Sequence, residues 1–522
     1  MGGRVLLSGL VAYVVSHFPR FWRFVSRRPI LRRWVNRFFI KWIASSEVPR
    51  PYPFSLWGPK ADVATYSSWT GLTDRTFTGR HLPPADTTYA ARLPDLDRLR
   101  PLFVRNEFRP CPKSTTLFAL FAQWFTDSFL RTDPNDFRKN TSNHEIDLCQ
   151  IYGLSNSDTQ LLRSPKDGKL RSIRINGFEF PDRIMNDQFR VKEQYRGLSY
   201  VKNDDYTPGL LPPFADRPER RKDLFLSGLD RGNSTIVYSA LNTIFMREHN
   251  RLCDLIKKAN STWDDDRVFE TARNTNIVCL LQIIICDYIN HLSTAQFRVY
   301  LDRAIAEQCR WYRTNRISAE FDLLYRWHPL APTTFDGLPD EEFRYNNALL
   351  IDRGVEWVLE QASKQSAGRI TLHNTAPFLI DAELAALQKA RKWRIAPYND
   401  YRKRFGLRPV SSFKELTADE ALAIELSRLY RNVDDLEFTI GLLAETRPGN
   451  AVLGELMTLM VGVDAFTQAL TNPLLSANVF CEDCFSSAGM TAILQTTDLQ
   501  GLVRRNAHKN SVVSFTKYWN CT

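Results

Sequence analysis

Several common functional signatures are missing from this 522-residue sequence. It contains no P-loop, no GxGxxG motif after a strand pattern, no HExxH and no GxSxG. These absences remove the most frequent nucleotide-binding, zinc-protease and serine-hydrolase interpretations. The sequence also lacks internal repeats and low-complexity tracts, and its charged fraction of 24% is ordinary for a globular protein. We therefore expect a folded protein whose function depends on a less common arrangement of residues.

Long apolar runs and a cysteine framework are absent as well. The apolar run Val5–Val15 has eleven residues, whereas a membrane-spanning helix needs about 20. Because no small-residue cleavage site follows this run, we expect the protein to retain it. The nine cysteines are odd in number and scattered, which predicts no disulfide framework. The single CxxC pair, Cys481 and Cys484, is interpreted as two ordinary thiols, since zinc sites usually combine two such pairs or add histidine.

The hydrophobic content is high enough for a large core. Hydrophobic residues make up 43% of the chain, which allows one big domain or two. Strand patterns are few and short, whereas apolar residues recur with helical spacing over long stretches. We predict a mainly α-helical protein with long loops. The expected helical stretches are 115–131, 236–258, 266–292, 316–327, 380–392, 416–430 and 450–470.

The positive charge is concentrated at the N-terminus. Residues 1–50 hold ten Lys or Arg and one acid, Glu47, so they carry +9 of the net charge of +11. A nucleic-acid-binding protein usually shows a basic face on its folded domain. Here the cations lie among Trp, Phe, Leu and Val, a composition typical of a membrane-surface element. We therefore predict a peripheral, monotopic membrane protein with no nucleic-acid partner.

The N-terminal arm divides into short helices. Pro19 and Pro29 separate them, and apolar residues then recur at three- and four-residue spacing from Leu31 to Ile43 with cations between them. This pattern favours an amphipathic helix lying in the membrane plane, and the alternative is a helix packed on the protein's own core. The proline-rich stretch Val48–Pro53 marks the boundary. We predict a membrane-binding arm over residues 1–53 and a catalytic domain over residues 54–522.

One of the eight histidines has unusual neighbours. A lone histidine is usually structural, but His328 lies in the segment Glu320–Leu330, which also contains Tyr325. Residues three apart lie near one another on a helix. A neutral imidazole can hold haem iron axially, and a tyrosine one turn away could pass an electron to an oxidised haem and become a radical. The alternative for Tyr325 is a core aromatic residue.

Several segments together resemble one family. YRWHPL (325–330) resembles the proximal-ligand motif of cyclooxygenases, the prostaglandin endoperoxide synthases, and MREHNRLCDL (246–255) resembles the hallmark helix of the wider animal-type haem peroxidases. The resemblance runs in order from about residue 20 to the C-terminus. The other matching segments are FAQWFTDSFLRT (121–132), HEIDLCQIYGL (144–154), DGKL (167–170), AGRI (367–370), YRKRFGL (401–407) and LEFTIGLL (436–443).

The resemblance implies a fold, a cofactor and a chemistry. It implies a haem-peroxidase-like helical domain on a membrane-binding arm, usually as a homodimer, with haem b as cofactor and His328 as the ligand of its iron. In that family the tyrosine matching Tyr325 forms a radical, which abstracts hydrogen from a polyunsaturated fatty acid before O2 adds. Pure peroxidases of the superfamily commonly carry Arg at the matching position. Tyr325 therefore favours a fatty-acid dioxygenase.

The distal helix departs from the family pattern. Gln123 matches the family's glutamine, but the position of its histidine, four residues later, is Asp127. The spacing puts Gln123 and Asp127 on one helix face. A carboxylate can serve as the base that accepts a proton from peroxide, although its ordinary pKa of about 3.9 makes it weaker than histidine. We expect weak or altered peroxidase turnover, unless Asp127 only makes local hydrogen bonds.

The substrate channel departs as well. By alignment, the Arg and Tyr that hold the fatty-acid carboxylate become Ala44 and Ala295, and Ala465 and Thr439 occupy two further positions that are Ser and Tyr in the family. Phe297, Phe321 and Leu324 keep an apolar character, and Lys41 or Arg50 could replace the lost clamp. These changes favour simple hydroperoxidation of an 18- or 20-carbon acid over prostaglandin formation.

Two alternatives remain open at this stage. One is a haem peroxidase, or an enzyme that rearranges lipid hydroperoxides without adding oxygen. The other is a haem-binding, membrane-associated pseudoenzyme, which Asp127, Ala295 and Thr439 favour. Oxygen uptake in the presence of a fatty acid separates the dioxygenase from both.

Overall fold

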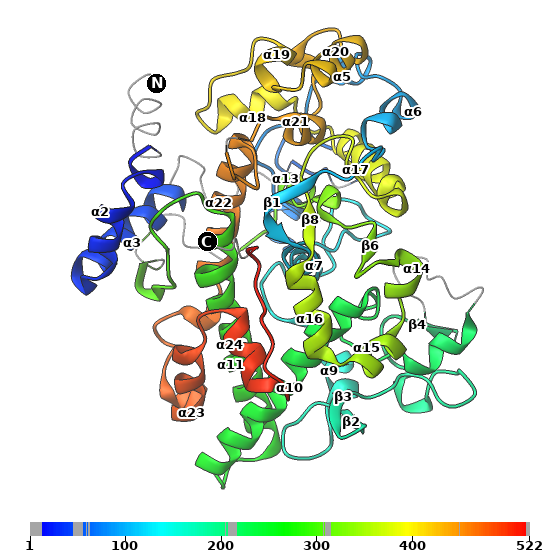
Figure 1. The fold of residues 1–522 in the computed structure, drawn as a ribbon, viewed down its shortest axis with the longest axis vertical. Coiled ribbons are helices and arrows are strands. Elements are labelled where there is room, and N and C mark those ends of the chain that lie inside the picture. Colours follow the sequence, from blue (N-terminus) through cyan, green and yellow to red (C-terminus); the bar gives the residue numbers. More distant parts are fainter. Residues whose placement is uncertain are drawn as a thin grey trace.

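The computed structural model describes residues 13–44, 56–58, 60, 63–203, 205–206, 217–305, 307, 309, 315–447 and 449–517. Helices dominate these residues, so the predicted mainly α-helical fold is confirmed (Figure 1). The expected domain boundary at Val48–Pro53, Arg50 and most of the apolar run Val5–Val15 lie outside the described residues.

The longer helices follow the predicted stretches closely. The helices of ten or more residues are α3 (Pro29–Ala44), α7 (Thr116–Thr126), α10 (Ile236–Ala259), α11 (Asp265–Ile283), α16 (Val355–Lys364), α17 (Ile380–Lys392), α20 (Glu420–Leu429), α22 (Glu455–Leu470) and α23 (Glu482–Gln495). The shorter ones are α2 (Pro19–Ser26), α4 (Trp69–Thr73), α5 (Thr87–Ala90), α6 (Leu96–Leu99), α8 (Cys149–Tyr152), α9 (Asn156–Leu162), α12 (Ile289–Leu292), α13 (Ala319–Leu324), α14 (Asp340–Phe343), α15 (Asn347–Arg353), α18 (Tyr398–Arg404), α19 (Phe413–Leu416), α21 (Phe438–Ala444) and α24 (Leu499–Asn506).

Helix α10 lies at the centre of the packing. It contacts α7, α11, α16 and α23, and it is buried along most of its length. Thr235 caps its N-terminus by accepting a hydrogen bond from the backbone N–H of Tyr238. Helix α7 rests on α10 and α16, and its residues from Thr116 to Thr126 are buried except Gln123. Helix α7, which carries Gln123, is therefore fixed against the middle of the core.

Within the described residues, the strands form small two-stranded sheets. The four two-stranded antiparallel sheets pair β1 (Pro110–Thr115) with β8 (Ser366–Gly368), β2 (Ser172–Ile175) with β3 (Phe178–Pro181), β4 (Val201–Lys202) with β5 (Asp205–Tyr206) and β6 (Thr334–Phe335) with β7 (Leu338–Pro339). The β1–β8 pair leads directly into α7, because Thr115 ends β1 and caps α7 with its hydroxyl group.

The predicted helix over 266–292 contains an irregularity. Helix α11 continues through a π-helical turn, η4 (Ile284–Tyr288), into α12. Such turns inside α-helices are frequent at functional sites, and this one ends at Tyr288. The whole stretch Asp265–Leu292 is long and apolar enough to cross a membrane, yet 78% of its most apolar window is buried inside the protein. We interpret it as a core helix.

The prediction of one helix over 316–327 is wrong. Helix α13 ends at Leu324, and Tyr325 is the C-cap residue that follows it. His328 begins a separate 3-10 turn, η6 (His328–Leu330). Pro329, the second residue of η6, has no N–H to extend a helix, so α13 could not have run on through this turn. Tyr325 and His328 therefore do not share a helix, although they are three residues apart.

The N-terminal helices begin at the predicted prolines and pack on the body. Helix α3 contacts α2 and α22 and buries Val35, Phe39 and Ile40 (Figure 1). Asn36 exchanges two hydrogen bonds of 3.0 Å with the backbone of Tyr300, once as donor and once as acceptor. One face of the arm thus packs on the protein's own core. The large side chains of Phe18, Phe21, Phe24, Ile30, Trp34 and Phe38 are exposed.

Candidate active site

His328 is positioned between a proline turn and a buried carboxylate. Its Nδ1 atom lies 3.2 Å from Oε2 of Glu383, which α17 supplies. The side chain of His328 is 19% exposed and that of Glu383 only 3%. Within the described residues no hydrogen bond occupies Nε2 of His328. With Nδ1 turned toward a carboxylate, Nε2 is the nitrogen whose electron pair is available to a metal.

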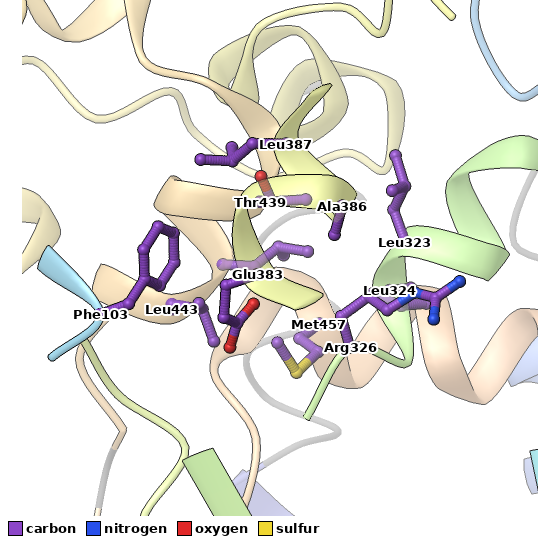
Figure 2. A pocket seen from close by; sticks show the side chains of 11 residues that line it. Phe103, Leu323, Leu324, Arg326, Glu383, Ala386, Leu387, Thr439, Leu443 and Met457 are labelled. Carbon is purple, nitrogen blue, oxygen red and sulfur yellow. The ribbon is translucent and has the colours of Figure 1, made fainter. Parts of the chain in front are cut away.

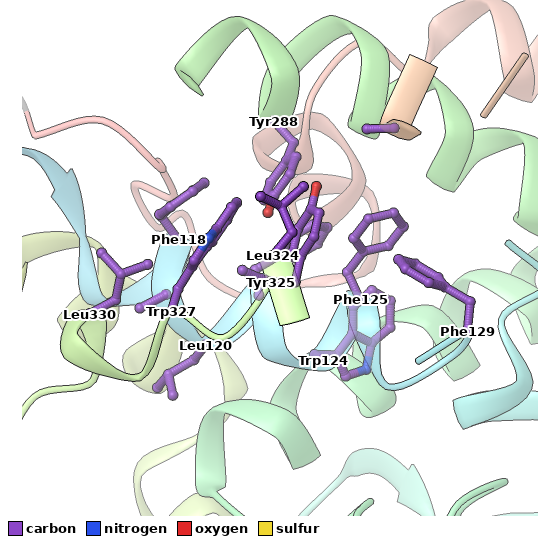
Figure 3. Packing of buried hydrophobic residues seen from close by; sticks show 14 of the residues in the cluster. Phe118, Leu120, Trp124, Phe125, Phe129, Tyr288, Leu324, Tyr325, Trp327 and Leu330 are labelled. Carbon is purple, nitrogen blue, oxygen red and sulfur yellow. The ribbon is translucent and has the colours of Figure 1, made fainter. Parts of the chain in front are cut away.

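Tyr325 is enclosed by aromatic rings. It stacks on Trp327 with ring centroids 4.4 Å apart, and Phe321 meets it edge-on at 4.9 Å. Figure 3 shows the hydroxyl groups of Tyr325 and Tyr288 turned toward each other in this cluster. Neither phenol oxygen has a partner with hydrogen-bond geometry, yet the two lie close enough for each to affect the other's pKa. Burial raises the pKa of Tyr325, so its phenol is neutral at physiological pH.

Aromatic contacts connect this cluster to α7. Phe118 stacks on Trp327 with centroids 6.2 Å apart, and its ring lies 5.2 Å from that of Tyr288. One helical turn past the end of α7, Phe129 stacks on Phe321 at 6.1 Å. The structure therefore brings the segment of Tyr325 and His328 against α7, which carries Gln123 and is followed directly by Asp127.

Asp127 is held in a buried ion pair. Its Oδ1 accepts a hydrogen bond of 3.0 Å from Arg231, and Arg131 pairs with Asp230 at 2.8 Å beside it. Burial raises the pKa of Asp127, and Arg231 and Arg131 oppose that rise. Gln123 lies one turn earlier on α7 and is partly exposed. Asp127 is thus paired with Arg231, in agreement with the local hydrogen bonding that the sequence analysis kept as the alternative to a role as base.

A second ion-pair cluster joins three segments around Asp322. This carboxylate on α13 accepts hydrogen bonds from Lys389 on α17, from Arg326 and from Thr132. Burial disfavours its charge, but Arg326 and Lys389 outweigh that cost and hold the pKa of Asp322 below its usual range. Burial lowers the pKa of Lys389 to about 8. The cluster fixes α13, and with it Tyr325, relative to α17 and the chain following α7.

The residues matched to the family's substrate channel are mostly apolar and buried. Ala465 lies on α22 and Ala44 ends α3, and both are buried. Phe297 packs under the arm against Trp22 and Phe39, with centroids 5.9 and 5.7 Å apart. A small pocket beside Glu383 is lined by Thr439, Arg326, Leu324 and Met457 among others (Figure 2). Thr439 adds a buried hydroxyl there, without a partner in the described chain.

The arrangement at His328 fits a haem better than a metal ion held by side chains alone. Across the described ranges, no three His, Cys, Asp or Glu side chains gather in a way that could hold a metal ion. A haem brings its own four nitrogen ligands and asks the protein for an axial imidazole. Among the described residues, His328 presents an imidazole whose Nε2 makes no hydrogen bond and whose Nδ1 faces a carboxylate.

Comparison with known proteins settles the family. The sequence model of the family "Animal haem peroxidase" matches residues 128–515. The chain belongs to the animal haem peroxidase family. Membership implies haem binding. Prostaglandin G/H synthase 1 of Mus musculus is 32% identical over 524 residues, which cover 96% of this chain and 81% of that protein. Prostaglandin G/H synthase 2 of Bos taurus is 30% identical over 525 residues, 97% of this chain and 82% of that protein.

Solved structures of this family's fold agree. Fatty acid alpha-dioxygenase of Oryza sativa, crystallised as a variant with palmitic acid, superposes with a TM-score of 0.67 at 17% identity and covers 95% of this chain and 93% of its own. Peroxidase A of Dictyostelium discoideum superposes with a TM-score of 0.63 at 17% identity and covers 91% of this chain and 99% of its own. These likenesses confirm the haem-peroxidase-like helical fold.

Two residues of this family member's site were missed by the sequence analysis. Glu383 lies 55 positions after His328, and Arg231 lies 104 positions after Asp127, so no local spacing connects either pair. The lone basic residue in LDRGN (229–233), ahead of the hallmark helix, was the available signal for Arg231. For Glu383, an acidic residue on an otherwise ordinary amphipathic helix gave none.

Breaking the Asp127–Arg231 ion pair should destabilise the protein in a pH-dependent way. In Arg231→Met, Asp127 loses its partner, and its pKa, already raised by burial, rises further. A buried pair broken on one side typically costs about 3–5 kcal/mol; we expect the low end, because Arg231 is 32% exposed. The deficit should be full above the folded pKa of Asp127 and shrink as pH falls toward the unfolded value of about 3.9.

Urea unfolding at pH 8 and pH 5 measures this effect. The double variant Asp127→Asn/Arg231→Met removes both charges and should recover most of the lost stability at pH 8. A deficit of equal size at both pH values would show that Asp127 is not the group left unpaired.

Proposed function

We propose that this protein is a haem-dependent fatty-acid dioxygenase that uses Tyr325 as a radical site. The observation that carries the proposal is the position of Tyr325: a buried, neutral phenol without an aligned hydrogen-bond partner, three residues before the imidazole that suits an axial ligand. The relatives support the reaction class, since two are named prostaglandin G/H synthases and one is a fatty acid alpha-dioxygenase.

The cofactor in this proposal is haem b, with Nε2 of His328 as the ligand of its iron. Haem, after reaction with a peroxide, would supply a one-electron oxidant. Tyr325 would give one electron and its phenolic proton to that oxidant and become a neutral radical. The surrounding rings of Trp327, Phe321 and Tyr288 exclude water from this radical. Such exclusion matters because a solvent-exposed radical would be lost to side reactions.

Tyr325 then takes part at both the start and the end of the oxygenation step. The radical takes a hydrogen atom from the fatty acid, which restores the phenol and leaves a carbon radical. Dioxygen adds to that carbon, and the peroxyl radical takes a hydrogen atom back from Tyr325, giving the hydroperoxide and the tyrosyl radical again. A polyunsaturated acid suits this cycle, because hydrogen flanked by two double bonds leaves most readily. The apolar positions Phe297, Leu324 and Ala465 suit an acyl chain.

The distal side supports only slow turnover of peroxide. Asp127 is engaged by Arg231, so it takes a proton from peroxide less readily than a free histidine would. Arg231, with its fixed positive charge, can instead stabilise negative charge on the leaving oxygen. The second candidate is a haem peroxidase, or an enzyme that rearranges lipid hydroperoxides without consuming O2.

Oxygen consumption by the haem-loaded protein tests the reaction. With linoleate or arachidonate and a trace of hydroperoxide, we expect uptake by the wild type and its loss, by at least about a hundredfold, in Tyr325→Phe. Tyr430→Phe makes the same chemical change at a distant buried tyrosine and should retain uptake. Palmitate, the acid present with the rice enzyme, tests whether the double bonds are needed.

The outcomes separate the candidates. Equal uptake by the wild type and Tyr325→Phe would remove Tyr325 from the mechanism. No uptake, together with consumption of added lipid hydroperoxide, would favour the rearranging enzyme. No reaction of either kind, with haem bound, would favour the pseudoenzyme.

We further propose that residues 1–53 bind a membrane surface and that the protein acts as a homodimer, as expected for the family. The exposed side chains of Phe21, Phe24, Trp34 and Phe38 project from α2 and α3 beside the arginines of the arm. Four of these arginines, Arg20, Arg23, Arg27 and Arg28, line an open hollow with Phe24. Aromatic residues interleaved with cations suit the interface of an anionic bilayer.

Vesicle binding tests the arm. Sedimentation with vesicles containing phosphatidylserine should capture the wild type, and replacing Arg20, Arg23, Arg27 and Arg28 with Gln should weaken capture by at least about tenfold, since each cation near the surface contributes about 1 kcal/mol. Replacing the exposed Arg98, Arg174, Arg190 and Arg428 with Gln changes the net charge equally and should have little effect. Equal losses in both variants would show that net charge, and not the arm, controls binding.

A further inference from the structure

We propose that Glu383 is a positioning residue for His328, and that its carboxylate makes His328 an electron-rich ligand which favours the oxidised cofactor. The inference rests on the proposed function, because it takes His328 as the axial ligand. It adds a residue that neither the family motifs nor the sequence pattern indicated.

The carboxylate of Glu383 has few other partners. Its Oε1 accepts a hydrogen bond of 3.1 Å from the hydroxyl of Thr375, and its Oε2 lies 3.2 Å from Nδ1 of His328. Among the described side chains, His328 is the one basic group within 4 Å of this carboxylate. Since no Lys or Arg of the described chain lies within 4 Å of this carboxylate, its nearest basic group is the imidazole.

Arg105 holds the two sides of this contact together. Its guanidinium donates hydrogen bonds to the carbonyl oxygen atoms of Pro329, Ala331 and Asn374, at 3.2, 2.8 and 2.9 Å. The first two belong to the turn that carries His328, and the third precedes Thr375, the partner of Glu383. One cation thus ties the histidine turn to the loop that orients the carboxylate. The fold therefore brings Glu383 and His328 together, because the backbone segments around them are tied to each other.

The contact is close but not yet aligned. The Oε2 atom of Glu383 is 3.2 Å from Nδ1 of His328 but lies off the direction of the Nδ1–H bond. The two groups therefore form no hydrogen bond in this geometry. Hydrogen bonds at catalytic sites are often poorly aligned until the site is loaded. The proposed role requires Nδ1–H of His328 to point at Glu383 once the cofactor is bound. Glu383 then fixes the tautomer that leaves Nε2 unprotonated.

An acceptor on Nδ1–H has a known effect on the ligand. A carboxylate there raises the basicity of the imidazole and tunes the metal, and axial-ligand electron density is one of the protein's means of setting the potential of a haem and assisting O–O cleavage. This matters more here than in a site with a free distal base, because Asp127 is engaged by Arg231. Electron donation from the proximal side compensates for the weak base on the distal side.

The test compares Glu383→Gln with Asp381→Asn in the haem-loaded protein. Asp381 lies on the same helix, is 89% exposed and pairs with Arg100. Asp381→Asn therefore removes a negative charge from α17 without changing a contact of His328. In Glu383→Gln we expect the ferric–ferrous equilibrium to shift at least about tenfold toward the ferrous form, a rise in midpoint potential of about 59 mV for one electron. We also expect a lower iron–histidine stretching frequency by resonance Raman and about 10- to 100-fold weaker haem binding.

Three further measurements make the result decisive. Asp381→Asn should leave potential and stretching frequency unchanged. Glu383→Asp keeps a carboxylate one methylene further from Nδ1 and should give intermediate values, which also covers the case in which Glu383→Gln folds poorly. Wild-type values in Glu383→Gln, with haem bound through His328, would overturn the inference. If His328→Ala leaves the haem spectrum unchanged, His328 is not the ligand, and the proposed function fails at that point independently of Glu383.

Discussion

The helix break after Tyr325 is the constraint on which the rest of the site depends. Had α13 continued through Pro329, the phenol and the imidazole would share one helix face. Instead the chain leaves the helix at Tyr325, passes Trp327 and turns into η6. The stacking of Trp327 on Tyr325 and Phe118 keeps the broken segment against α7, and Arg105 holds its far end through the carbonyl groups of Pro329 and Ala331. Tyr325 is sealed in aromatic packing while His328 stays partly exposed.

Three buried carboxylates lie around the segment 325–330. Asp127 with Arg231, Asp322 with Lys389 and Arg326, and Glu383 beside His328 each place a carboxylate among apolar helices. Buried ion pairs contribute little net stability, because desolvation offsets most of the attraction. Their contribution here is geometric: each pair joins two segments that are far apart in the sequence. Asp322 and Asp127 pair with cations, whereas Glu383 accepts from the Thr375 hydroxyl and has His328 as its one basic neighbour within 4 Å among the described side chains. Glu383 is therefore the carboxylate available to influence a cofactor.

The sequence predicted the fold class and the long helices well, because their apolar periodicity is local information. The stretches at 236–258 and 380–392 agree with α10 and α17 to within a residue. The site was predicted in part. Tyr325, His328, Gln123 and Asp127 were found through motifs, and the structure brings their segments together, although their roles remain proposals. The helix break at Tyr325 was missed because the apolar spacing of 316–327 continues past the end of α13. Glu383 and Arg231 were missed because tertiary contacts, and not spacing, join them to His328 and Asp127.

The central claim is that oxidising equivalents from the haem reach Tyr325. Freeze-quench electron paramagnetic resonance of the haem-loaded protein, after mixing with a fatty-acid hydroperoxide, tests it most directly. The account predicts a tyrosyl radical signal whose shape changes when the protein is made with ring-deuterated tyrosine, and which disappears in Tyr325→Phe while the resting ferric signal stays unchanged. A tyrosyl signal of the same shape and yield in Tyr325→Phe, or no tyrosyl radical in a wild-type protein that consumes oxygen, would contradict it.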